Sequence, residues 1–162
     1  MQAKQEARPV LKIEVSKKDT MYEIAAALLL LMLWVLSVYT TWHSAAAHTA
    51  APKPGAVLQF LILPLLGSLV YTALTLLNRY PHCFNYPVKL TAENALQQYS
   101  LATRLIRYLK FIILLTFALF ALSQLLAEQN RLHGLAMWLL PVFLLLIYVP
   151  LIRTIMKLFK AE

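Results

Sequence analysis

Charged residues, cysteine and glycine are all scarce in this chain. Charged side chains make up 14% of the 162 residues and hydrophobic ones 60%, whereas an ordinary globular domain is about a quarter charged and about half apolar. We therefore expect lipid to be the solvent for most of the chain, and no soluble domain large enough to fold alone. The single cysteine, Cys83, excludes an internal disulfide and leaves the redox compartment open.

The residue patterns that support catalysis are missing as well. The sequence has no Gly-rich phosphate loop. Apart from Cys83 next to His82, it has no nucleophile with a plausible base beside it. Adjacent side chains of an extended stretch point apart, so the two form a poor dyad. They also lack the second ligand pair that a structural zinc site needs. The other histidines, His43, His48 and His133, fall on the opposite side of the predicted membrane. We predict no catalytic residue, no metal and no cofactor.

What the chain has instead is four long uncharged apolar runs. A bilayer core about 30 Å thick is crossed by about 20 helical residues, which matches these runs. Because they are continuously apolar and do not alternate every second residue, we predict an all-α membrane protein and not a barrel. The predicted spans are residues 23–42, 55–78, 108–127 and 133–153. Lys110 is expected to snorkel toward the headgroups. Pro64, Pro141 and Pro150 are expected kink sites, tolerated where neighbours satisfy the freed carbonyls.

The basic residues are distributed unequally about these spans. Thirteen Lys and Arg residues lie in segments 1–22, 79–110 and 153–160, and two, Lys53 and Arg131, lie on the other side. Cytoplasmic loops carry the excess of Lys and Arg, so both termini and the central segment are predicted to be cytoplasmic. A net charge of +8 also suits a nucleic-acid binder, but such a protein gathers its charges on a soluble face. The predicted partner is the bilayer, including its anionic headgroups, and not nucleic acid.

A cleaved signal peptide is the alternative interpretation of the first span. Ser44 and the alanines at 45–47 would supply the small residues of a cleavage site. The apolar run exceeds the usual length of about 7 to 15 residues, which favours a retained helix.

The segment after the second span gathers aromatic and polar side chains between Pro81 and Pro87. The prolines favour extended geometry at the residues before them, so we predict a rigid turn at headgroup level. It could bind an anion, a peptide or a metal, or it could be an interfacial cap. Thr91 is the predicted N-cap of an interfacial amphipathic helix that continues into the third span, with Arg104 and Arg107 away from its apolar stripe. The candidate partner-binding residues are Tyr80, His82, Phe84, Asn85, Tyr86, Asn94 and Tyr99.

Small and hydroxyl side chains recur within two spans. Such stripes are usually helix contact faces, where Ser and Thr bond to a neighbouring helix. A path for a neutral solute is the alternative. The apolar runs contain no carboxylate, histidine or arginine of the kind that ion and proton transport needs. The predicted helix-packing residues are Gly67, Ser68, Thr72, Thr75, Thr116 and Ser123.

The run from Leu77 to Lys110 contains Tyr80-Pro81-His82, Phe84-Asn85-Tyr86-Pro87 and Ala102-Thr103-x-x-Ile106-Arg107. With the segment from Arg8 to Trp34 it covers about two thirds of the chain, and it resembles bacterial membrane proteins that carry the domain of unknown function sixteen forty-eight. Those proteins usually have a His-Phe-Asn triplet in the first outer loop, which residues 42–55 lack. Some relatives are joined to immunity proteins that signal to a regulator at the membrane. The resemblance implies a binding or regulatory role in the bacterial inner membrane.

Three hypotheses of function follow from these patterns. The first is a non-enzymatic multi-pass protein that binds a protein or peptide partner at the membrane through residues 79–110. The second is a small carrier or channel for a neutral solute, assembled as a homo-oligomer with a lumen of Ser and Thr side chains. The third is a membrane enzyme in which His82 or Cys83 meets a carboxylate such as Glu93. The missing catalytic patterns and the resemblance favour the first.

Overall fold

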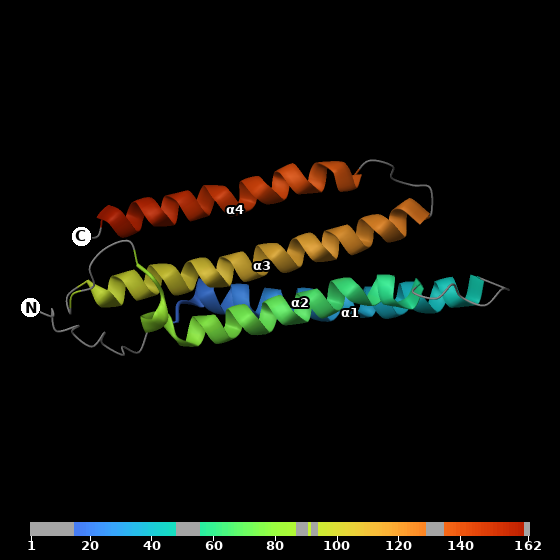
Figure 1. Cartoon of the computed structure of the whole chain (residues 1–162), viewed down its shortest axis with the longest axis horizontal. Helices are drawn as coiled ribbons and strands as arrows, with labels where there is room; N and C mark the ends of the chain where they lie inside the picture. The colour runs from blue at the N-terminus through green and yellow to red at the C-terminus, as the bar shows by residue number, and fades with distance from the viewer. Residues whose placement is uncertain (1–14, 48–55, 87–90, 92–93, 129–134, 161–162) are drawn as a thin grey trace, which may run out of the picture.

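The computed structural model describes residues 15–47, 56–86, 91, 94–128 and 135–160. Four long helices and one short 3-10 helix occupy this part of the chain (Figure 1). Each long helix is apolar and long enough to cross a membrane, which confirms the all-helical, four-span prediction at that level. The elements are α1 (Lys17–Ala47), α2 (Ala56–Arg79), η1 (Pro81–Cys83), α3 (Ala95–Glu128) and α4 (Leu135–Lys160).

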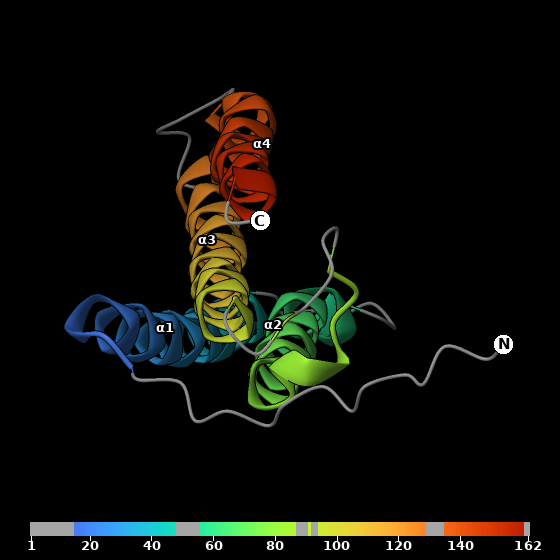
Figure 2. The ribbon, with the colours of Figure 1, turned by 90° about the vertical axis from the view of Figure 1, so that its left-hand side faces the viewer.

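Helix α3 is the centre of the bundle. It packs against α1, α2 and α4, and α1 packs against α2. Seen from the end in Figure 2, α4 stands on the opposite side of α3 from the α1–α2 pair. Successive helices run in opposite directions (Figure 1), so α1 and α3 begin, and α2 and α4 end, at one end of the bundle. We call this the charged end, for the residues described below.

The packing between the helices is thin, and most large apolar side chains face outward. Leu33 and Leu114 are among the few large apolar side chains that are fully buried. Gly67 lets α2 approach them, because a Cβ atom on this glycine would lie 2.9 Å from Leu33 Cδ2 and 3.4 Å from Leu114 Cδ2. In contrast, Leu28 and Trp138 are exposed. An outward apolar surface of this extent is what a lipid solvent favours.

Two side chains of α3 hold α4 by its carbonyl groups. Pro150 has no N–H, so the carbonyl of Leu146, four residues earlier, loses its helical donor. The Tyr108 hydroxyl donates to that carbonyl at 3.2 Å, which confirms for Pro150 that a neighbouring helix satisfies the freed group. The buried Gln98 Nε2 donates to the carbonyl of Leu158 at 3.0 Å, one of the last carbonyls of α4, which lack intrahelical donors.

Candidate functional site

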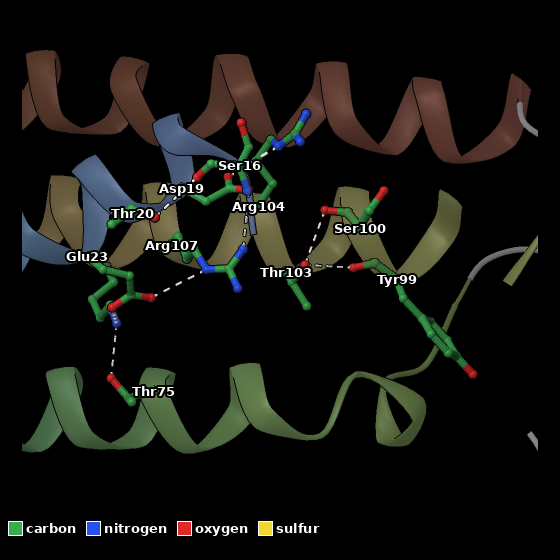
Figure 3. A network of polar contacts seen from close by, with 11 residues as sticks. Ser16, Asp19, Thr20, Glu23, Thr75, Tyr99, Ser100, Thr103, Arg104 and Arg107 are labelled. Atoms are coloured by element: carbon green, nitrogen blue, oxygen red, sulfur yellow. Dashed lines mark hydrogen bonds and ion pairs between the residues drawn. The ribbon is translucent and has the colours of Figure 1, made fainter. Parts of the chain in front are cut away.

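A network of charged side chains joins α1 to α3 at the charged end (Figure 3). Residues spaced by three or four lie on one face of a helix, so two acids of α1 face three bases of α3. Arg104 Nε lies 3.3 Å from Asp19 Oδ1, and Arg107 Nη1 lies 3.6 Å from Asp19 Oδ2. Arg107 Nε lies 3.5 Å from Glu23 Oε1, and Lys110 Nζ bonds Glu23 Oε2. We call Asp19, Glu23, Arg104, Arg107 and Lys110 the charged network.

Several of these charged side chains are buried, and a buried charge needs a partner. The Lys110 side chain is 0% exposed and that of Asp19 is 3% exposed, whereas that of Arg104 is 55% exposed. Removing a charge from water costs several kcal/mol unless it is paired and hydrogen-bonded. Lys110 meets that condition with help from α2, because its Nζ donates to Thr75 Oγ1 at 3.0 Å and lies 4.7 Å from the centre of the Tyr71 ring. Three helices therefore enclose one ammonium group.

Two further residues, Ser16 and Asn78, make polar contacts with the network. The backbone N–H of Ser16 donates to Asp19 Oδ2 at 3.0 Å, so Asp19 also caps the start of α1. With its amide oriented to satisfy both of its neighbours, Asn78 on α2 accepts from Arg107 Nε at 3.0 Å and donates to the Thr103 carbonyl at 3.2 Å. Both α1 and α2 therefore contribute polar groups to the network around α3.

The expected positions of Lys110 and Arg107 are wrong. Lys110 does not snorkel to a surface, and Arg107 is buried among α1, α2 and α3. The expectation that ionisable groups lie outside the spans is corrected too, because candidate spans Lys17–His43 and Ala95–Leu126 include the whole network. The reason is that α1 begins at Lys17, which brings two carboxylates opposite α3. The sequence did contain a signal for this network. The two acids lie four residues apart and the three bases lie three residues apart, so each set falls on one face of its helix.

The aromatic segment forms a braced turn beside this network, over residues 80–86. The Tyr86 hydroxyl donates to the Pro81 carbonyl at 2.9 Å, and the Tyr86 ring lies 5.5 Å from that of the buried Tyr99. Phe84 packs on Tyr86 at a ring distance of 6.1 Å. Tyr80 and Asn85 are exposed. The turn therefore points some of the candidate residues inward and offers others to solvent.

His82 and Asn94 have local roles. The half-buried His82 lies in η1, and its ring is 6.1 Å from that of Tyr80. The backbone N–H of Asn94 donates to Thr91 Oγ1 at 3.3 Å, and that of Thr91 donates to Asn94 Oδ1 at 2.8 Å. This reciprocal pair has the hydrogen-bond pattern of a capping box just before α3, which begins at Ala95. Thr91 as the N-cap residue stays a prediction. Glu93, the carboxylate considered for an enzyme, lies outside the described residues.

The predicted helix-packing residues fall into two groups. Gly67, Ser68 and Thr75 meet other helices: Ser68 accepts from Trp34 Nε1 at 3.1 Å and donates to the Pro64 carbonyl at 2.8 Å. The remaining hydroxyls stay on their own helices. Thr116 and Ser123 donate within α3, and Thr72 is exposed on α2.

Within the described residues, no group of three or more His, Cys, Asp or Glu side chains could hold a metal ion. No family model, curated protein or solved structure matches the chain. The resemblance to membrane proteins with the domain of unknown function sixteen forty-eight stays a prediction. The two most elaborate local arrangements among the described residues are thus the charged network, which joins α1, α2 and α3, and the braced turn.

Proposed function

We propose that this chain is a non-enzymatic, multi-pass protein of the bacterial inner membrane that binds a protein or peptide partner on its cytoplasmic face. The excess of Lys and Arg in segments 1–22, 79–110 and 153–160 supports an orientation with both termini and the charged end in the cytoplasm. Helix α3 has 34 residues, more than the about 20 that cross a bilayer core. Its first turns therefore reach the headgroup level, where the braced turn is accessible from the cytoplasm.

The observation that carries the proposal is the braced turn. Tyr80 is 55% exposed, and Cys83 and Asn85 are exposed beside it. Tyr86 ties this surface to α3 through its contacts with Pro81 and Tyr99. A surface restrained by such contacts loses less conformational entropy on binding than a free loop does, and tyrosine is enriched among the residues that dominate binding energies.

The polar groups between the helices support a binding role over transport. The buried carboxylate of Asp19 and the partly exposed one of Glu23 are paired with arginine or lysine, and the hydroxyls of Ser68, Thr116 and Ser123 donate to backbone carbonyls. The ion pairs fix α1 relative to α3, whereas these hydroxyls are satisfied on their own helices. The lumen of a neutral-solute channel requires hydroxyls that face water.

Cys83 provides the experiment, because it is exposed and the sequence has no other cysteine. A membrane-impermeant maleimide is expected to label it in inverted membrane vesicles and not in intact cells. A benzophenone maleimide on Cys83 is then expected to crosslink a partner from the vesicles. The adduct is expected to disappear in a Tyr80→Ala, Asn85→Ala variant. The matched control is Tyr148→Ala, because Tyr148 on α4 is also 55% exposed. An adduct that survives in the turn variant, or crosslinks to lipid alone, would overturn the proposal.

A further inference from the structure

A second site lies away from the braced turn, in the angle between α1 and α4. There a hollow of about 490 Å³ is lined by three helices. Figure 2 shows α1 and α4 leaving α3 in different directions at this end, so that α3 forms the floor of the angle. Each helix contributes one cation to the lining: Lys18 from α1, Arg104 from α3 and Lys157 from α4. We call this the basic hollow.

The positive charge of the basic hollow is not neutralised by the network beside it. Arg104 shares Asp19 with Arg107, and the charged network contains three bases for two acids. Lys18 and Lys157 add two further charges, and neither has an ion-pair partner among the described residues. Ser16 and Thr154, which both carry hydroxyl groups, are also among the lining residues. Cations and hydroxyls from separate helices are the donors that bind a phosphate group.

The rest of the lining is apolar and continues along α4. Tyr108 and Pro150 line the basic hollow and also a second hollow of about 210 Å³, whose other lining residues are Leu145, Leu146, Val149 and Arg153. The three apolar residues precede Pro150 on α4, so the apolar part of the second hollow leads away from the charged end, whereas Arg153 lies on the charged-end side of Pro150. Together, the two hollows offer cations for a phosphate group and an apolar surface for an acyl chain. A free phosphate would occupy the basic hollow alone, whereas a phospholipid would occupy both hollows.

We propose that the basic hollow binds the phosphate of an anionic phospholipid, with an acyl chain along the second hollow. Basic pockets between helices at the cytoplasmic side are the sites at which such headgroups bind. A lipid held there contacts α1 and α4 at once, and so braces α4 from a second side in addition to α3. The site is separate from the braced turn and is tested independently of it.

The experiment measures binding of phosphatidylglycerol to the purified full chain in a neutral detergent, by native mass spectrometry, with phosphatidylcholine as the reference lipid. The test variant is Lys18→Gln, Lys157→Gln. The matched control is Lys17→Gln, Arg79→Gln, which removes two exposed charges from the same end but outside the hollow. At about 1 kcal/mol for each lysine, binding to the test variant is expected to weaken about thirty-fold. The control is expected to weaken it less than about three-fold.

Three results would overturn the proposal. One is an equal loss in both double variants, which would mean attraction to net charge. Another is equal affinity for phosphatidylcholine, which would mean non-specific detergent exchange. The third is displacement of the lipid by inorganic phosphate at a comparable concentration, which would mean a site for a free anion. Far-UV circular dichroism of both variants keeps a folding defect distinct from a loss of binding.

Discussion

Replacing Glu23 with glutamine tests the account of the charged network. Glu23 pairs with Lys110, whose side chain is 0% exposed, and Glu23 itself is 31% exposed. Two unit charges about 4 Å apart attract by about 4 kcal/mol at an effective dielectric constant of about 20. Breaking a buried pair by removing one partner costs about 3–5 kcal/mol. Because Glu23 is partly solvated, we expect Glu23→Gln to lower the free energy of unfolding by about 3 kcal/mol.

The assay is a titration with sodium dodecyl sulfate in mixed micelles, followed by far-UV circular dichroism. Adding Lys110→Met to Glu23→Gln removes the orphaned charge, so the double variant is expected to be more stable than Glu23→Gln alone. Arg104→Gln is the matched control, because Arg104 is half exposed and such pairs contribute less than about 1 kcal/mol. The reasoning is refuted by a Glu23→Gln variant that loses no more stability than Arg104→Gln, since Lys110 would then have water or another partner.

Two further predictions concern contacts between helices. Gly67→Leu is expected to lower stability by about 1–3 kcal/mol, because a Cβ at this position already meets Leu33 and Leu114. Gly67→Ala should be near neutral, since its gain of about 1 kcal/mol in helix propensity offsets the closer contact; equal losses in the same titration would contradict this packing. Tyr108→Phe is expected to cost about 1 kcal/mol by leaving the Leu146 carbonyl without its donor. Adding Pro150→Leu returns an N–H to α4 and should recover that loss, and a double variant as unstable as Tyr108→Phe would show that the hydroxyl has another role.

The sequence predicts the membrane-crossing parts of the helices well, because apolar length is a local property. The ends of the helices are harder to predict from the sequence. Asp19 looks like part of a hydrophilic leader until α3 supplies its partners, and Arg107 and Lys110 look like surface residues until α1 supplies theirs. Pairings between residues more than eighty positions apart have no local signal. A capping arrangement near Thr91 was predictable, because capping hydrogen bonds such as those between Thr91 and Asn94 form within four residues. The inward and outward faces of residues 80–86 depend on Tyr99, so composition alone could not separate them.

The charged network has a consequence for how the chain enters a membrane. An isolated α3 carries Arg107 and Lys110 with no counter-charge, and basic residues oppose insertion by up to about 3 kcal/mol each, depending on depth. The acids that relieve this cost are on α1, which precedes α3 in the chain and is synthesised before it. The two carboxylates of α1 are therefore in place before the basic residues of α3 are made, and the order of translation favours correct assembly.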